Sequence, residues 1–267
     1  MSSVFTVISL NTWKGEGDYE SRLGWMADGL LALRPDVVFL QEAFECIDCN
    51  ADTATIMANA LDLHPTSFKA RQKDRRVKGQ YLPSWSNLAI LTPGAPTETG
   101  SFKLADHTQD QDRWGIYVDI EVNGCPMRLL NTHFTHFHDE EGQQVRVQQA
   151  EQVAREVLAC QKELVIFGGD LNASQETKPF QVLFEINNFL SLDDVTPTST
   201  MQGERFNPKA PPHKRIDFLF GRASEPSLHR HMTVRESIAM NRPVGSTGEF
   251  PSDHAAVVLT MTGLGQE

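Results

Sequence analysis

The feature that most constrains the fold is a series of short apolar runs that recurs from one end of the chain to the other. Each run is rich in Val, Ile, Leu and Phe and has about the length of a normal β-strand. Asn123-Gly124, between two of the runs, is typical of a two-residue hairpin turn, which predicts that these two strands are antiparallel. The predicted strands are 4–10, 36–40, 87–91, 115–122, 127–130, 164–168, 216–220 and 255–260.

Helical patterns lie between the predicted strands. From Tyr19 to Leu33 the apolar residues recur at helical spacing, and Pro35 ends the pattern. Two further helices are predicted at 53–63 and 143–161. Helices that alternate with strands of both directions favour an α/β sandwich of mixed sheets over a purely parallel sheet. The sequence has no internal repeat, low-complexity tract or linker, so we expect a single domain over 1–267.

Four segments rich in Pro, Gly, Asn, Ser or Thr are predicted as loops. Loops of this length often carry function. The segments are 94–100, 105–112, 196–214 and 241–252.

The chain has a formal net charge of −11, which argues against a protein that coats duplex DNA through a broad basic surface. A local basic site remains compatible with this charge. We find no apolar stretch long enough to span a bilayer and no leader-like N-terminal segment, so the expected location is the cytoplasm. Nothing in the sequence indicates an obligate protein partner.

The four cysteines are too few for a disulfide framework in a chain of this length. Cys46 and Cys49 form a single C-x-x-C, whereas a zinc ribbon needs a second such pair. A redox motif would open a helix after a strand, for which the sequence offers no further support. We therefore interpret the pair as structural thiols or a chance pattern.

The most informative residues are polar and stand at the ends of the predicted strands. One group follows the carboxyl ends, and a second lies at or near the start of its strands. In a mixed sheet the carboxyl end of one strand lies beside the amino end of an antiparallel neighbour, so all of them are expected at one edge. The first group is Asn11, Glu42, His133, Asp170 and Asn172, and the second is Asp217, Asp253 and His254.

An edge with four carboxylates would be repulsive without a cation or proton between them. Carboxylate and amide oxygens suit Mg²⁺, or Mn²⁺ in its place, and the absence of a His/Cys-rich set argues against zinc. A cation, a carboxylate that orients water and an imidazole are together suited to phosphoester hydrolysis. A single strand-end Asn or Asp is often only a turn former, but that explanation does not account for the whole set.

The series N-T-W at Asn11, Q-E at Glu42, N-T-H at His133, G-D-L-N at Asp170, R-I-D-F at Asp217 and S-D-H at Asp253 resembles the endonuclease/exonuclease/phosphatase superfamily. This superfamily includes DNase I-like nucleases, abasic-site endonucleases, deadenylases, sphingomyelinases and inositol-polyphosphate 5-phosphatases. The resemblance covers nearly the whole chain. It implies a DNase I-like four-layer α/β sandwich, with two packed mixed β-sheets flanked by helices, and a Mg²⁺-dependent phosphoester hydrolase.

The resemblance also implies a role for each residue. Glu42 would be the principal metal ligand, with Asn11 and Asp253 on the metal side. Asp170 would orient the attacking water and Asn172 would hold that water or a phosphate oxygen. The remaining residues would act on the phosphate: Asp217 and His254 as the pair that stabilises the pentacovalent phosphorus, His133 on the scissile phosphate, and Arg113 as a phosphate-contacting arginine. By spacing alone, His136 and His138 are interpreted as solvated or supporting histidines.

The substrate class is less constrained. Trp13 stands where abasic-site endonucleases carry a carboxylate, and the segment around Asp217 lacks the Trp-Cys-Asp-Arg signature of the 5-phosphatases. A basic stretch at 69–78 is either a solvated loop or a rim that holds a phosphate-rich substrate. A phosphoester of nucleic acid, a phospholipid headgroup or a small molecule all fit.

Two alternatives differ in function from this reading. A sphingomyelinase-like phosphodiesterase would need an exposed aromatic or apolar hairpin for membrane contact, and the sequence shows no clear one. A catalytically inert binding module would have lost Glu42, Asp170 or His254, and all three are present.

Overall fold

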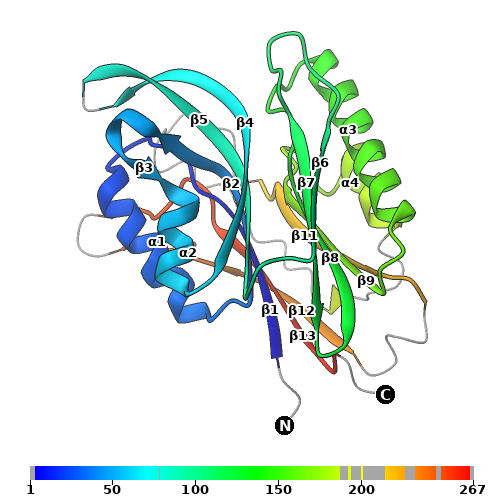
Figure 1. The fold of residues 1–267 in the computed structure, drawn as a ribbon. Coiled ribbons are helices and arrows are strands. Elements are labelled where there is room, and N and C mark those ends of the chain that lie inside the picture. Colours follow the sequence, from blue (N-terminus) through cyan, green and yellow to red (C-terminus); the bar gives the residue numbers. More distant parts are fainter. Residues whose placement is uncertain are drawn as a thin grey trace.

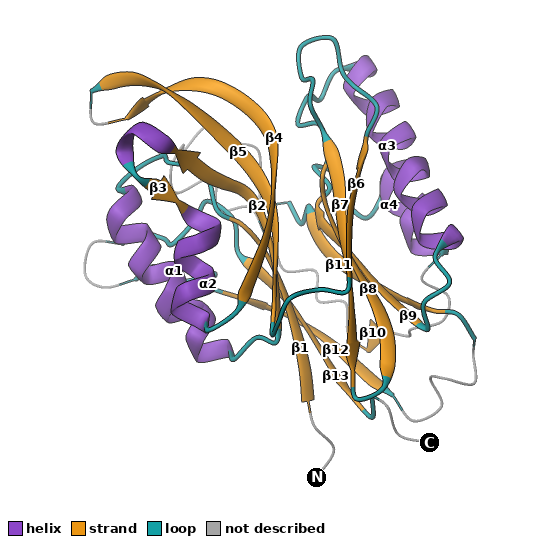
Figure 2. Ribbon diagram, viewed as in Figure 1, coloured by secondary structure: helices purple, strands orange, loops and turns teal. Residues whose placement is uncertain are grey.

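The computed structural model describes residues 4–77, 79–186, 192–193, 200, 214–225, 232–244 and 248–264. Two mixed β-sheets pack face to face, and helices cover the outer face of each sheet (Figure 1). Helices α1 and α2 lie on one side of the sandwich and α3 and α4 on the other (Figure 2). The four-layer α/β sandwich predicted from the sequence is confirmed.

In the described part of the chain, the first sheet has eight strands. Strand β1 runs parallel to β2 and antiparallel to β13, which places the ends of β1 and β2 beside the start of β13. The strand order is β10 (Leu192–Asp193), β12 (Thr233–Ala239), β13 (Ala256–Thr262), β1 (Val4–Asn11), β2 (Val37–Cys46), β5 (Gln80–Thr92) and β4 (His64–Val77), with β3 (Ala51–Asp52) paired to β2.

The second sheet has five strands in the described residues. Strands β8 and β9 are parallel, and the other pairs are antiparallel. The β7–β8 hairpin turns at Asn123 (φ 52°) and Gly124 (φ 80°), which confirms the turn predicted from this dipeptide. The order is β11 (Asp217–Ala223), β9 (Leu164–Asp170), β8 (Cys125–His133), β7 (Trp114–Val122) and β6 (Glu98–Lys103).

Helix α1 (Tyr19–Leu33) has the bounds that its apolar spacing predicts. The Asp18 carboxylate caps it by accepting from the Ser21 amide, and Arg34 ends it in the left-handed conformation. Helix α2 (Thr53–Leu61) and helix α3 (Glu140–Ala159) agree with their predictions to within a few residues, whereas α4 (Lys178–Glu185) and the short 3₁₀ helix η1 (Ile47–Cys49) were not predicted.

Three apolar layers hold the sandwich together. The layer between the sheets is formed by side chains such as Phe39, Ile90 and Leu129, all three of which are buried. Near the strand ends this layer turns polar, because the Gln41 amide donates to Ser9 and to Asn131. The amide of Asn131 in turn donates to two carbonyls of the first sheet, which joins the two sheets beneath the edge that carries the predicted site residues.

One predicted loop, and the solvated-loop interpretation of the basic stretch, need correction. The basic stretch 69–78 is not a loop: it belongs to β4, which pairs along its length with β5, although Lys78 lies outside the described residues. The predicted loop 94–100 ends early, because β6 begins at Glu98. The β4–β5 hairpin projects beyond the body of the sandwich, and Tyr81 on it is 75% exposed (Figure 1).

The other three predicted loops lie wholly or partly in the described residues. The segment 105–112 has no strand, as predicted. Of the segment 196–214, only Thr200 and Lys214 are described, so the prediction falls outside the described residues. The described part of 241–252 contains a single isolated bridge between Val244 and Glu249.

The cysteine interpretation also changes. Cys46 and Cys49 are joined in a disulfide at the end of β2, rather than being unpaired thiols. Cys125 and Cys160 are free and buried.

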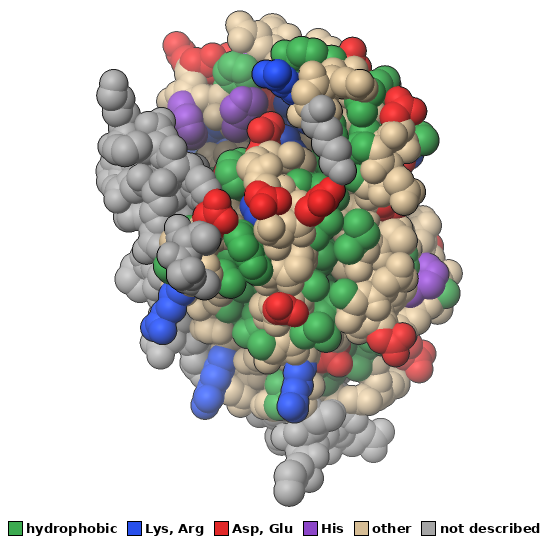
Figure 3. Space-filling view, turned by 90° about the vertical axis from the view of Figure 1, so that its left-hand side faces the viewer, with side chains coloured by type: hydrophobic (Ala, Val, Ile, Leu, Met, Phe, Trp, Pro, Cys, Tyr) green, Lys and Arg blue, Asp and Glu red, His purple; other side chains and the backbone are tan. Residues whose placement is uncertain are grey.

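On the face seen in Figure 3, acidic side chains are scattered among hydrophobic and neutral ones. In the described part of the chain, none of the helices has the length and hydropathy needed to cross a membrane.

Candidate active site

The ends of β1 and β9 bring the two sheets together at one edge of the sandwich. Asn11 is the last residue of β1 and Asp170 the last of β9, and the Asn11 amide donates to the Asp170 carboxylate across the two sheets (Nδ2–Oδ2 2.9 Å). Both side chains are almost completely buried. The convergence predicted from the strand ends is therefore present for the two residues that are 159 positions apart in the chain.

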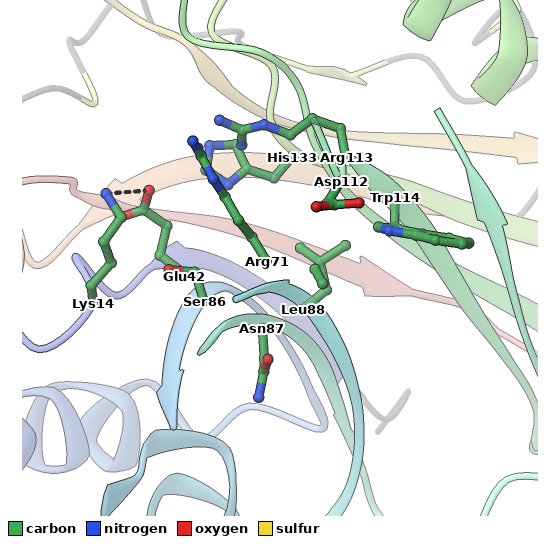
Figure 4. Close-up of a pocket in the computed structure, with 11 residues that line it drawn as sticks. Lys14, Glu42, Arg71, Ser86, Asn87, Leu88, Asp112, Arg113, Trp114 and His133 are labelled. Carbon is green, nitrogen blue, oxygen red and sulfur yellow. Dashed lines mark ion pairs between the residues drawn. The ribbon is translucent and has the colours of Figure 1, made fainter. Parts of the chain in front are cut away.

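Glu42 is presented by a β-bulge. The pairing of β2 with β5 shifts register between Leu40 and Ala43, and Glu42 takes a positive φ of 53°. A non-glycine residue in this region is strained, and such residues concentrate at functional sites. The bulge turns the carboxylate into the cleft, where it pairs with Lys14 (Oε1–Nζ 2.8 Å, Figure 4). Burial opposes ionisation of Glu42, but Lys14, His133 and His254 together outweigh it and lower the pKa of the carboxyl.

Asp170 is held at both carboxylate oxygens. Oδ1 accepts from the Asn172 backbone amide (2.9 Å), and Oδ2 faces Asn11 and His133 Nε2 (3.3 Å). Burial opposes its ionisation, yet His133, His254 and the hydrogen bond from Asn11 lower the pKa of Asp170. The Asn172 side chain donates to the Phe134 carbonyl, which fixes the turn after β9. In its ionised form this carboxylate can accept a further hydrogen bond.

Two glycines allow β9 to reach this position. Gly168 and Gly169 have φ values of 152° and 131°, which L side chains rarely adopt. A Cβ on Gly168 would lie 2.0 Å from the Phe218 carbonyl oxygen, and a Cβ on Gly169 would lie 2.1 Å from the Thr132 carbonyl oxygen. The Gly-Gly pair before Asp170 therefore lets its strand lie close to both neighbours.

Asp217 and His254 form a buried pair. Asp217 begins β11, next to Asp170 in the strand pairing, and its Oδ2 lies 2.9 Å from His254 Nδ1. Burial disfavours the charged imidazole, but Asp217 and Asp253 raise the pKa of His254 well above its ordinary value. His254 Nε2 is 3.9 Å from both the Asp170 and Asp253 carboxylates, so the second ring nitrogen faces the centre of the site.

The turn that carries Asp253 and His254 is tied to the end of β1. The Ser252 hydroxyl donates to the Asn11 carbonyl (2.6 Å) and accepts from the His254 backbone amide (3.1 Å). Burial and the charge of Glu42 act to raise the pKa of Asp253, to about 6, against the opposing effect of His254. Glu42 and Asp253 are thus close enough to repel each other.

Arg113 reaches the site but is held by a residue that the sequence analysis missed. Its guanidinium contacts Asp110 (Nε–Oδ2 2.9 Å), which is completely buried and also accepts from Thr135 and Arg71. His136 lies 3.2 Å from Arg113 and is half exposed, which agrees with the supporting role expected for it.

A pocket on the β4–β5 side is lined by three of the predicted site residues, Glu42, Arg113 and His133 (Figure 4). Glu42 and His133 line it together with three cationic side chains, Lys14, Arg71 and Arg113. Burial and the charge of Arg113 lower the pKa of His133, so the imidazole is neutral near pH 7. The pocket therefore has an anionic end at Glu42 and cationic walls.

All nine predicted site residues thus gather at one edge of the sandwich. Four further residues were missed: Lys14, Arg71, Asp110 and Ser252. The basic stretch signalled Arg71 and the S-D-H motif contained Ser252, whereas nothing in the local sequence marks Lys14 or Asp110 as site residues.

The donor set fits a divalent cation. Glu42, Asp253 and Asn11 offer hard oxygen atoms, and burial together with the charge of Glu42 raises the pKa of Asp253, an effect that a cation would offset. Ligand atoms of Asp170, Asp217 and His254 also lie within 4.8 Å of one another. In this second group, His254 Nδ1 is already hydrogen-bonded to Asp217, and the raised pKa of His254 favours the charged ring, which cannot bind a metal ion. The Glu42 side is therefore the better place for a cation.

The fold and this edge define a protein of the DNase I-like class. The family model for the endonuclease/exonuclease/phosphatase family matches residues 8–254, and the chain belongs to this family. No curated protein matches the sequence in a direct comparison.

Several solved structures share the fold. Truncated TDP2 from Caenorhabditis elegans has a TM-score of 0.67 at 19% identity, with 97% of this chain and 98% of that chain covered. The human Nocturnin catalytic domain with a bound sulfate anion has a TM-score of 0.70 at 18% identity, with coverages of 97% and 93%. An endonuclease/exonuclease/phosphatase from Beutenbergia cavernae has a TM-score of 0.72 at 18% identity, with coverages of 97% and 71%.

Proposed function

We propose that this protein is a divalent-metal-dependent phosphoester hydrolase that uses Mg²⁺ or Mn²⁺. The observation that carries the proposal is the meeting, at one buried edge, of Asp170, of His254 backed by Asp217, and of Glu42 on its bulge. Membership of the endonuclease/exonuclease/phosphatase family supports the same activity.

Asp170 orients the attacking water. Its lowered pKa keeps it an anion, and its Oδ2 faces the centre of the site beside Asn11. Asn172 supports it through its backbone amide, so the carboxylate cannot turn away. A water that donates to Asp170 is held with its lone pair free for the phosphorus.

His254 stabilises the negative charge that builds up on the phosphate oxygens. Asp217 holds Nδ1, which leaves the Nε2 proton directed at the reacting group. His133, neutral and 3.3 Å from Asp170, contacts the scissile phosphate, and Arg113 contacts it from the pocket wall. The sulfate anion bound to the Nocturnin catalytic domain supports anion binding in this fold.

Glu42 would hold the cation, with Asn11 and Asp253 beside it. When bound, a divalent cation neutralises charge on the phosphate and helps to position it. Lys14, which now pairs with Glu42, is exposed enough to move when a cation takes its place (33% exposed side chain).

Hydrolysis of bis-p-nitrophenyl phosphate tests the proposal. We expect turnover with Mg²⁺ or Mn²⁺, its loss in EDTA, and a fall of at least ~10²-fold in kcat for His254→Ala, the scale of acid–base and charge stabilisation by one side chain. His64→Ala is the matched control, because His64 is exposed at the start of β4 and should leave kcat unchanged. Full activity of His254→Ala would overturn the mechanism.

A substrate panel separates the branches of the family. Supercoiled plasmid, p-nitrophenyl phosphate, sphingomyelin vesicles and inositol phosphates are assayed side by side with the same protein and metal. Turnover of sphingomyelin alone would favour the phospholipid phosphodiesterase. Absence of turnover on every substrate, together with measurable ligand binding, would favour an inert binding module.

A further inference from the structure

Lys14 gives the carboxylates on the proposed metal side a cation that belongs to the chain itself. Its Nζ lies 2.8 Å from Glu42 Oε1 (Figure 4). Burial acts to raise the pKa of Glu42 and that of Asp253, and the charge of Lys14 opposes burial at both. An ammonium group and a divalent cation that bind the same carboxylate compete for it, because the same attraction holds both. Lys14 is therefore placed to weaken the binding of a cation at Glu42.

The main chain at Lys14 is held firmly in place. Lys14 has a positive φ of 47°, which non-glycine residues rarely adopt, and the Arg22 guanidinium of α1 donates to its carbonyl (2.9 Å). A Cβ on Gly15, the next residue, would lie 2.9 Å from the ring of Phe44 in β2. The loop that carries Lys14 is thus packed between α1 and β2, close to the bulge that presents Glu42.

The Lys14 side chain, by contrast, is only partly buried and can reach a second acceptor. Its four-carbon stem is flexible, and its side chain is 33% exposed. Lys14 lines the same pocket as Arg113 and His133, the two residues proposed to contact the scissile phosphate. A phosphate held by these two residues would give an ammonium group released from Glu42 a new anionic acceptor in that pocket.

We infer that Lys14 is a mobile counter-ion that couples the binding of the divalent cation to the binding of the phosphate. Lys14 pairs with Glu42 first and, once Glu42 holds the cation, pairs with a phosphate oxygen instead. The inference rests on the proposed function for the positions of the cation and of the scissile phosphate. A phosphate draws Lys14 away from Glu42, and a cation at Glu42 frees Lys14 for the phosphate, so each ligand strengthens the binding of the other by the same factor.

A binding experiment that needs no turnover tests this inference. Metal-free protein is titrated with Mn²⁺, and free Mn²⁺ is followed by electron paramagnetic resonance with and without methylphosphonate, a phosphate analogue that has no ester to cleave. The coupling factor is the ratio of the two Mn²⁺ dissociation constants. We expect Lys14→Met to bind Mn²⁺ alone about tenfold more tightly, and its coupling factor to be about fivefold smaller or less, the size of a typical coupling between two ligands.

The coupling factor separates the inference from a simple effect of charge. Removal of a nearby positive charge would tighten Mn²⁺ binding and weaken methylphosphonate binding, but it would leave the coupling factor unchanged. An unchanged coupling factor in Lys14→Met would therefore overturn the inference, even if Mn²⁺ bound more tightly.

Lys69→Met is the matched control. Lys69 loses the same charge, but it pairs with Glu45 (2.6 Å), which is three residues after Glu42 on β2 and lies outside the proposed cation site. This variant should keep the Mn²⁺ affinity and the coupling factor of the unmodified protein.

Lys14→Gly is a second test variant for the case in which Lys14→Met does not fold. Glycine adopts the positive φ of this position without strain, so the variant should fold. It lacks the ammonium group and should show the same two changes in Mn²⁺ binding.

Hydrolysis of bis-p-nitrophenyl phosphate distinguishes a failure of this inference from a failure of the proposed function. At saturating Mn²⁺ we expect Lys14→Met to raise KM by about tenfold, the size of one charge-assisted hydrogen bond, with a smaller change in kcat. A KM that does not rise would refute the pairing of Lys14 with the phosphate. If neither protein hydrolyses the ester while the loss of coupling holds, the proposed function fails and the role of Lys14 in binding stands. If Mn²⁺ binds neither protein, the cation site and this inference both fail.

Discussion

Gly169 has a conformation that no other residue type can adopt without cost. Its φ of 131° is strained for L residues, and an added Cβ would meet the Thr132 carbonyl oxygen at 2.1 Å. We predict that Gly169→Ala lowers the free energy of unfolding by roughly 2–4 kcal/mol, the combined size of backbone strain and a backbone clash. Urea denaturation followed by circular dichroism measures this change.

Gly24→Ala is the matched control at the same scale. Gly24 is an exposed position inside α1, where an added Cβ meets nothing within 4 Å. The same substitution there should raise the free energy of unfolding by about 0.5–1 kcal/mol, because alanine is the better helix former. A Gly169→Ala protein as stable as the unmodified one would contradict the close approach of β9 to β8.

At the residue scale the sequence selected residues that the structure brings together, but not the geometry that holds them. Asp170, Asp217 and His254 could be selected because each stands at a strand end within a short motif. The bulge that gives Glu42 a positive φ depends on how β2 pairs with β5, which no local pattern encodes. Asp110 lies in a loop without a motif, and only the packed structure shows that it holds Arg71 and Arg113.

Among the elements, α1 does more than cover a sheet. Its Arg22 is buried and donates to five backbone carbonyls, four in the segment after Asn11 and one at Pro251. The segment after Asn11 carries Lys14, and Pro251 precedes the turn that carries Asp253 and His254. A single helix side chain therefore fixes two of the loops that build the site.

We predict that Arg22→Lys reduces kcat on the bis-p-nitrophenyl ester by about tenfold or more, because one ammonium group has three donors and cannot hold five carbonyls. A purely structural role would lower the melting temperature and leave kcat of the folded protein unchanged. The comparison is Arg34→Lys, the same substitution at the exposed C-terminal end of α1. Thermal melts and steady-state kinetics on both variants separate the two cases, and unaltered kcat in folded Arg22→Lys would disprove the positioning role.

Elements with a strong apolar pattern were predictable, and elements without one were not. Helix α1 and strand β1 agree closely with their predictions because one face or the whole run is apolar. Strand β4 was missed because it is polar and basic and lies at the end of its sheet, where its stability comes from pairing with β5. The disulfide between Cys46 and Cys49 was not predictable either, because it depends on the local geometry after β2.

Across the whole molecule, acidic residues outnumber basic ones. The free energy of unfolding therefore depends on which carboxylates are ionised and paired with a cationic side chain. Asp119 of β7 is buried and is bound by Arg128 of β8 (2.7 Å) and by Lys162, just before β9 (3.2 Å). Burial opposes its ionisation, but hydrogen bonds from Arg128 and Lys162 outweigh burial and lower the pKa of Asp119. This one carboxylate thus links three consecutive segments of the second sheet.

A carboxyl whose pKa is lowered by folding contributes stability above its unfolded pKa of about 3.9 and loses it as the pH falls through the folded value. Asp119→Asn should therefore reduce the free energy of unfolding by about 2 kcal/mol or more at pH 7, by leaving Arg128 without its buried partner. The difference from the unmodified protein should shrink as the pH is lowered below about 4, because the unfolded chain then binds a proton at Asp119 while the folded protein does not, and it should be lost only below the lower pKa of the folded state. Asp28→Asn, the same change on the exposed face of α1, should have little effect at either pH. Urea denaturation between pH 3 and pH 7 measures both variants, and a difference for Asp119→Asn that stays constant over this range would show that the stabilisation does not come from the ionised carboxylate.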